Sequence, residues 1–230
     1  YVDSVEYGIW LTISSILGWF TFFDLGFTHG FRNKCAEALA RNNINDARCY
    51  VSTTYVSFFI IFSLVYLIFF IVNKVIDWSF VLNIAVDLGK MVQETFDIIA
   101  FFFCMQIILG VINSLLLADQ KPAFSSFLSS LGQLIILVVI WVLTKTTTGT
   151  LLGLASVMSI VPVFVLFVSS IILFKNKYRD IRPSVHFYNK KYVRSIVGLG
   201  SKFFVIQLSS IFVFQALNII ISHTLGPEQV

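Results

Sequence analysis

Charged residues are scarce in this chain of 230 residues, at 12% against about 25% in an ordinary soluble domain. Apolar residues make up 57% and aromatic residues 16%, with 25 phenylalanines spread along the chain. Several apolar runs exceed about 18 residues with few or no charges, which is the pattern of transmembrane helices. The composition excludes a soluble domain and predicts an all-α, polytopic protein of the lipid bilayer.

Cysteine and histidine are also few, and neither is spaced as in a metal or catalytic site. The three cysteines, Cys35, Cys49 and Cys104, form no CxxC pair and are odd in number, which argues against a disulfide framework or a zinc site. The three histidines are far apart and belong to no HExxH or triad-like motif. The sequence therefore predicts no metal, no cofactor and no catalytic residues.

Six apolar segments are long enough to cross a hydrocarbon core of about 30 Å as helices. These predicted spans are residues 8–30, 50–72, 96–117, 123–143, 151–174 and 195–221. Because lipid cannot satisfy backbone polar groups, each span must be helical where it faces lipid.

The distribution of Lys and Arg predicts the orientation of the spans. The connectors 31–49, 118–122 and 175–194 carry twelve of these residues, whereas the connectors on the opposite side carry three. The richer side is expected in the cytoplasm, so the net charge of +4 is a topology signal and not a nucleic-acid signal. Residue 1 would then start on the outer face, and we expect another helix before it and more chain after residue 230.

The outer connector 73–93 contains apolar residues that share one helical face. They are Trp78, Val81, Leu82, Ala85 and Leu88. This pattern predicts a short helix lying in the outer membrane interface, where tryptophan is favoured; an irregular solvated loop is the alternative. The short connector 144–150 predicts that the fourth and fifth spans are neighbours.

Polar and small residues recur at helical spacing in four spans. The stripes are Ser14, Thr21, Asp24 and Thr28 in the first span, Gln106, Gly110 and Asn113 in the third, Ser126, Ser129, Ser130 and Gln133 in the fourth, and Gly200, Gln207, Asn218 and Ser222 in the sixth. Helix packing through small residues explains any single stripe. Four stripes together are expected if the helices surround a hydrated cavity. Both interpretations stay open.

Asp24 and Lys202 are ionisable residues within the spans, and such residues are functional candidates because their burial is costly. Asp24 lies near the inner end of the first span, where it can also cap the helix or pair with Arg32. Lys202 lies about two turns into the sixth span, where it can also extend to the interface. Gly26 and Gly30 permit a close helix approach, and Pro162 removes a backbone donor within the fifth span.

Six short motifs follow one another along the chain: Tyr7-Gly8-x-Trp10, Asp24-Leu25-Gly26-Phe27, Ala38-Leu39-Ala40-Arg41, Asp77-Trp78, Ala118-Asp119-Gln120-Lys121-Pro122 and Leu225-Gly226-Pro227-Glu228-Gln229-Val230. In this order they resemble the motifs of the bacterial Wzx-type oligosaccharide flippases. These flippases belong to the multidrug/oligosaccharidyl-lipid/polysaccharide (MOP) exporter group, together with MATE exporters and MurJ lipid II flippases. No single motif is specific, but their order and spacing extend over nearly the whole chain.

The resemblance implies that the six spans are helices two to seven of a two-bundle transporter. Residues 1–174 would supply five helices of the N-terminal bundle, 175–194 the cytoplasmic linker between bundles, and 195–230 the first helix of the C-terminal bundle. The protein would be a transporter, not an enzyme, in the bacterial inner membrane.

The implied activity is to flip undecaprenyl-diphosphate-linked oligosaccharide repeat units from the cytoplasmic to the periplasmic leaflet by alternating access, for O-antigen or capsule synthesis. Polysaccharide polymerase machinery is a possible partner. The candidate substrate contacts are Lys202, Arg32, Gln207, Asn218, Gln106, Asn113 and Gln133. A MATE-like drug or cation antiporter is the alternative. A membrane-embedded sugar transferase is disfavoured, because the cytoplasmic acids are scattered.

Overall fold

The computed structural model describes residues 4–20, 25–146 and 149–225, with side chains described for 7–15, 26–86, 88–146 and 149–209. All regular structure in these ranges is helical, as predicted. The elements are α1 (Ser4–Phe20), α2 (Leu25–Ala40), α3 (Ile44–Val75), α4 (Trp78–Leu82), α5 (Val86–Ala118), α6 (Pro122–Thr146), α7 (Leu151–Lys175), the 3-10 helices η2 (Arg179–Ile181) and η3 (Val185–Phe187), and α8 (Lys190–Leu225).

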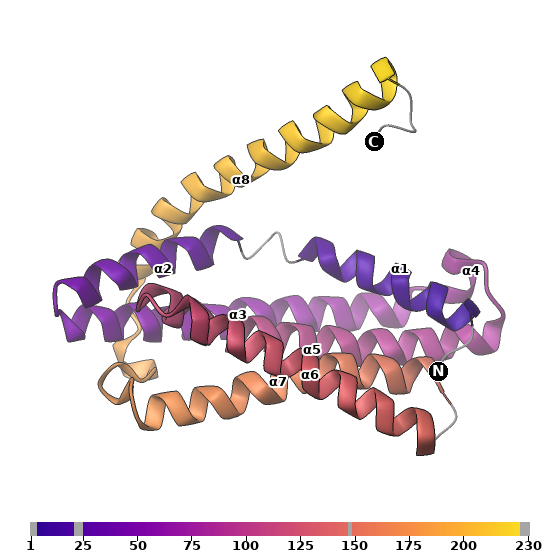
Figure 1. Cartoon of the computed structure of the whole chain (residues 1–230), viewed down its shortest axis with the longest axis horizontal. Coiled ribbons are helices and arrows are strands. Elements are labelled where there is room, and N and C mark those ends of the chain that lie inside the picture. Colours follow the sequence, from indigo (N-terminus) through magenta and orange to yellow (C-terminus); the bar gives the residue numbers. More distant parts are fainter. Residues whose placement is uncertain (1–3, 21–24, 147–148, 226–230) are drawn as a thin grey trace.

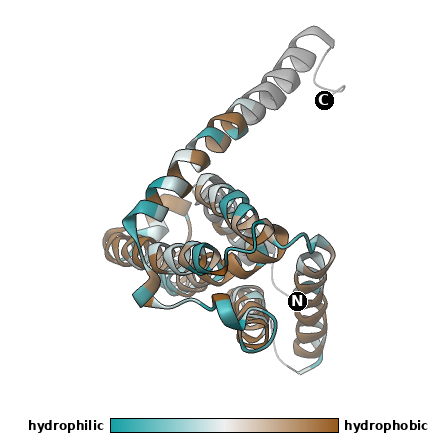
Figure 2. Ribbon diagram, turned by 90° about the vertical axis from the view of Figure 1, so that its left-hand side faces the viewer, coloured by the Kyte–Doolittle hydropathy of each residue, from teal (hydrophilic) through white to brown (hydrophobic). Residues whose placement is uncertain are grey.

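Four helices among the described residues are long and apolar enough to cross a membrane: α3, residues 88–118 of α5, α6 and α7. They contain the second to fifth predicted spans. Large apolar side chains such as Leu64, Leu137 and Phe164 are exposed on them, and Figure 2 shows hydrophobic ribbon over much of the bundle. These faces are suited to lipid, which is consistent with the predicted membrane location. The count of six spans is not confirmed.

Helix α5 is the centre of the bundle. It contacts α1, α2, α3, α4, α6 and α7, and side chains such as Ile112 and Leu115 are fully buried. The four long helices run side by side, whereas α8 leaves the bundle at an angle (Figure 1). Helices α6 and α7 pack on each other, which confirms that the fourth and fifth spans are neighbours.

The predicted connector 31–49 is mostly helical. Helix α2 continues ten residues beyond Gly30 and is separated from α3 only by residues 41–43. Phe31, Cys35 and Ala38 are buried at the spacing of one helical face, and Glu37 pairs with lysine and arginine on the exposed face. The polar residues that suggested a loop are therefore the solvated side of an amphipathic helix.

The outer connector 73–93 is mostly helical, but its helix is shorter than predicted and its tryptophan is buried. Helix α4 ends at Asn83, which has a left-handed φ of 51°, and α5 begins three residues later. Trp78 is buried, and its ring stacks on Phe96 at 4.3 Å between centroids. The tryptophan thus packs α4 onto α5 instead of anchoring it among lipid headgroups.

The three basic connectors lie at one end of the bundle, as predicted. The Tyr178 hydroxyl donates to Asp119 Oδ2 at 2.7 Å, which joins the α7–α8 connector to the α5–α6 connector. The Tyr192 hydroxyl donates to Asp46 Oδ1 at 2.6 Å, which joins α8 to the start of α3. We call this end, where α7 connects to α8, the linker end, and the opposite end the α4 end.

Helices α2 and α8 cross at their glycines. A Cβ atom built on Gly30 would overlap with the Ile196 carbonyl, and one built on Gly200 would overlap with the Gly26 carbonyl. The backbones can approach this closely only because these positions have no side chain. The close approach predicted for Gly26 and Gly30 is confirmed, and α8 is their partner.

Candidate functional site

A cavity of about 170 Å³ lies between α5, α6 and α7 and is lined by three of the predicted substrate contacts, Gln106, Asn113 and Gln133. Gln106 and Asn113 are two turns apart on α5 and therefore share a face. The rest of the lining consists of Leu128, Ser129, Gly132, Pro162, Val165 and Leu166. The polar stripes of the third and fourth spans thus meet at one site.

The cavity is polar but uncharged. Its lining contains amide and hydroxyl groups and no Asp, Glu, Lys, Arg or His. The Asn113 Oδ1 atom is buried and accepts no hydrogen bond from a described residue. An unsatisfied buried carbonyl costs about 1–3 kcal/mol, so a hydrogen-bond donor entering the cavity would be stabilised there. The site is suited to a neutral ligand with hydroxyl groups, or to water.

A second cavity of about 270 Å³ lies on the other side of Gln106, between α1, α5 and α7. It is lined by Trp10, Ser14, Ile99, Phe103, Gln106, Met158 and Ser159. The Ser14 Oγ atom is buried without a hydrogen-bond partner among the described residues. Ser14 belongs to the polar stripe of the first span, so three of the four predicted stripes border adjoining cavities.

Pro162 contributes to the first cavity, a role that the sequence analysis missed. Proline has no N–H, so the Met158 carbonyl one turn earlier lacks its helical partner. Helix α7 nevertheless continues through Pro162 to Lys175. Met158 lines the second cavity, and Pro162 lines the first. The sequence identifies the proline, but which cavity it lines depends on how α7 packs on α5.

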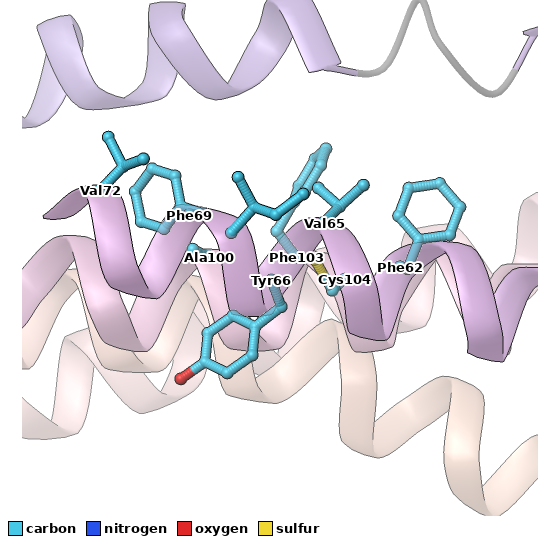
Figure 3. A pocket seen from close by; sticks show the side chains of 9 residues that line it. Phe62, Val65, Tyr66, Phe69, Val72, Ala100, Phe103 and Cys104 are labelled. Atoms are coloured by element: carbon cyan, nitrogen blue, oxygen red, sulfur yellow. The ribbon is translucent and has the colours of Figure 1, made fainter.

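An apolar groove of about 290 Å³ lies along α3 and α5 (Figure 3). It is lined by Phe62, Val65, Tyr66, Ile68, Phe69, Val72, Ala100, Phe103 and Cys104. In Figure 3, Phe62, Val65 and Phe69 extend from the same side of α3, and the Tyr66 ring points the other way. Phe103 borders this groove and the second cavity. The second cavity therefore adjoins the apolar groove at Phe103 and the first cavity at Gln106.

The predicted cations are not part of the cavity. Arg32 is half-buried, and its Nη2 lies 3.1 Å from His29 Nδ1. Lys202 is exposed on α8, where Gln207 is half-buried, and none of the three lines the polar cavity.

Two further predicted residues lie outside the described side chains. Asp24 is outside the described residues, and Asn218 lies in α8 with an undescribed side chain. The structure therefore brings together three of the seven candidate contacts, all of them amides of α5 and α6.

Comparison with known proteins gives no match. No protein-family model, no curated protein and no solved structure is similar to this chain at a significant level. The conclusions on this chain therefore depend on its own residues and their geometry.

Proposed function

We propose that this chain is part of a transporter that flips undecaprenyl-diphosphate-linked oligosaccharide repeat units across a bacterial inner membrane by alternating access. The observation that carries the proposal is the meeting of Gln106, Asn113 and Gln133 at one uncharged cavity between apolar helices. The motif order described above supports the same class. In this proposal the linker end, with its excess of basic residues, is the cytoplasmic end.

The chemistry of the cavity matches a sugar. An Asn or Gln side chain offers both an amide donor and a carbonyl acceptor, and a sugar hydroxyl also does both. Ser129 adds a hydroxyl, while Leu128 and Val165 provide apolar surface for the ring carbons. A cation would find no carboxylate here, so the lining favours a neutral glycan over a cationic drug.

The apolar groove offers a surface for the polyprenyl chain of the same substrate. Its lining is almost entirely hydrocarbon, which favours an isoprenoid over any polar group. Phe103 and Gln106 lie three residues apart on α5, one bordering the groove and the other the polar cavity. A lipid-linked sugar requires this combination of an apolar and a polar surface at short range.

The test uses a strain that lacks the gene and is complemented with variants. Gln106→Leu, Asn113→Leu and Gln133→Leu are expected to lower the export of repeat units about tenfold or more, since each loses a polar contact of about 1–3 kcal/mol. Lipid-linked repeat units should accumulate on the inner leaflet. Ser130→Leu is the matched control, because Ser130 is exposed on α6 and does not line the cavity.

The same strains distinguish the alternatives. Unchanged surface polysaccharide together with raised drug sensitivity in the deletion strain would replace the flippase by a drug or cation antiporter. A sugar transferase would need acids free to hold a metal or nucleotide sugar. Glu37 and Asp119 are instead held in ion pairs with neighbouring Lys or Arg side chains, which argues against that class.

A further inference from the structure

Carboxylates at the linker end are occupied by nearby partners. Asp46 accepts a hydrogen bond from the Tyr192 hydroxyl at 2.6 Å. Glu37 forms ion pairs with Lys34 at 3.0 Å and with Arg41 at 2.8 Å. Among the described residues, no ion pair joins these acids to the basic residues that begin α8.

Asp119 is occupied in the same way. It accepts a hydrogen bond from the Tyr178 hydroxyl and forms ion pairs with Lys121 and Lys177. Between Lys190 and Ser209, α8 itself contains no Asp or Glu. The remaining acid of the connector is Asp180, which is exposed on η2.

The start of α8 presents three exposed cations. Lys190, Lys191 and Arg194 are exposed, and none forms an ion pair in the part of the chain that the structure describes. They lie within about 6 Å along the helix axis, at 1.5 Å per residue. The opposite face of α8, including Ile196 and Gly200, is buried, so the cations occupy the open face.

The same open face becomes apolar farther along the helix. Val197, Val205 and Ile206 are exposed by 46%, 61% and 60%, with Lys202 also exposed among them. In Figure 2 the ribbon of α8 is hydrophilic at the linker end and carries both hydrophobic and hydrophilic bands farther along. A cationic cluster followed by apolar residues matches the order of a bilayer, in which phosphate groups lie outside the acyl chains.

We propose that Lys190, Lys191 and Arg194 form a binding site for the phosphate groups of anionic phospholipids, with the apolar residues beyond them contacting the acyl chains. The ligand is a phosphate group at the membrane surface, because the three cations lie within the first five residues of α8. It does not need the transported substrate, so the site would bind phospholipid whatever the protein carries. Bound lipid would hold the start of α8 at the interface.

Native mass spectrometry of the detergent-solubilised full chain, titrated with phosphatidylglycerol or phosphatidylcholine, tests the site. Substituting K190Q, K191Q and R194Q together is expected to weaken phosphatidylglycerol binding by tenfold or more, because each cation near an anionic lipid surface contributes about fivefold. Phosphatidylcholine binding should not change. Raising the salt concentration should weaken the preference of the wild type for phosphatidylglycerol over phosphatidylcholine, and should leave the lipid binding of the triple variant unchanged.

Two controls make the result specific. The pair K90Q and K145Q removes two exposed lysines from the α4 end and should change phosphatidylglycerol binding less than twofold, whereas K190Q with K191Q should lower it strongly. The charge-preserving set K190R, K191R and R194K should retain it. The proposal is overturned if the triple variant binds phosphatidylglycerol as wild type does, or if it loses both lipids equally. Selective loss of a polyprenyl diphosphate, with phosphatidylglycerol binding intact, would also overturn it.

Discussion

Asn73 is fully buried near the α4 end of α3, and its side-chain amide holds three segments together. Its Nδ2 donates to the Gln93 carbonyl at 3.0 Å and to Asp97 Oδ1 at 2.6 Å. Its Oδ1 accepts a hydrogen bond from Trp78 Nε1 at 2.6 Å. Both polar atoms of the amide are therefore satisfied, and α3, α4 and α5 are joined at one residue.

Replacing this amide with a hydrocarbon of similar size should be strongly destabilising. Asn73→Leu leaves the buried Trp78 indole N–H without its partner and removes the hydrogen bond to Asp97 Oδ1, and each unsatisfied buried group costs about 1–3 kcal/mol. We expect the free energy of unfolding to fall by at least about 2 kcal/mol, measured by circular dichroism in mixed micelles. Asn33→Leu is the control, since Asn33 is exposed on α2; an equal loss there would contradict the role of Asn73.

Tyr178 predicts a dependence of stability on alkaline pH. Burial of the ring, followed by hydrogen bonding to Asp119, raises the pKa of its hydroxyl above the ordinary 10.0. Below pH 10 the hydroxyl is protonated in both states, so the stabilisation is fully present. Above pH 10 the unfolded chain ionises first, and stability should fall by up to about 1.4 kcal/mol per pH unit.

The control for this effect is Tyr178→Phe, which cannot ionise and cannot donate to Asp119. Near pH 8 the variant should be less stable by about 1.5–3 kcal/mol, the range for a hydrogen bond to a charged group. Between pH 10 and 12 its stability should decline less steeply than that of the wild type. Parallel curves for the two proteins would mean that Tyr178 does not contribute to the alkaline transition.

At the scale of elements, the crossing of α2 and α8 depends on glycine. Gly200→Val would place side-chain atoms where the Gly26 carbonyl lies, so the helices must separate. His29 and Phe203 stack across this crossing with centroids 5.6 Å apart. With the native cysteines replaced by serine, cross-linking between cysteines introduced at these two positions should therefore be slower by an order of magnitude or more in Gly200→Val than in the parent chain.

Gly198 supplies the matched control on the same helix. A Cβ atom at Gly198 meets nothing within 4 Å, so Gly198→Val should leave the rate of cross-linking unchanged. If both valine variants slow the reaction equally, the cause is the helix propensity of valine and not the crossing.

The long helices were predictable, and part of the site was too. Unbroken apolar runs define α6 and α7 to within three residues at each end, and α3 to within six residues at its start and three at its end, because lipid leaves no alternative to helix. Gln106 and Asn113 share a face by helix geometry alone. By contrast, the sequence did not predict that α2 continues beyond Gly30. Its charged residues dominate the average hydropathy of a short sequence window, and its buried face has only about one residue per turn.

Contacts between helices could not be predicted from one sequence. The apolar groove requires α3 and α5 to lie side by side at a particular rotation, so Phe103 belongs to the site only once packing is known. The Asn73 network is similar, since its partners Trp78 and Asp97 are set by how α4 folds back on α5. Helical periodicity predicts which residues share a face of a helix, but not which helix packs against that face.

At the scale of the whole molecule, the α7–α8 connector crosses the linker end and is hydrogen-bonded to α3. The Ser184 N–H donates to Ser52 Oγ at 3.1 Å, and the Asn189 N–H donates to Thr53 Oγ1 at 3.3 Å. The Arg48 guanidinium lies 4.0 Å from the centroid of the Phe187 ring. The connector is therefore packed along α3, and together with the glycine crossing it joins α8 to α2 and α3.

The position of the connectors predicts which residues share a compartment. Single cysteines at Asn45, Ala123 and Asn176, which are exposed at the linker end, should react with a membrane-impermeant maleimide from the same side. Single cysteines at Phe80 and Thr144, exposed at the α4 end, should react only from the other side. All five positions are uncharged, so the substitutions leave the balance of Lys and Arg that orients the chain unchanged.

The excess of basic residues at the linker end predicts that this end lies in the cytoplasm. In sealed right-side-out bacterial vesicles, Phe80→Cys and Thr144→Cys should be labelled, and the three linker-end cysteines only after the membrane is permeabilised. The native cysteines are replaced by serine in the parent chain, since Cys49 is partly exposed. Labelling of the three linker-end positions from outside would invert the orientation. Labelling of only some of them would contradict the contacts of Tyr178 and Tyr192 that gather the connectors at one end.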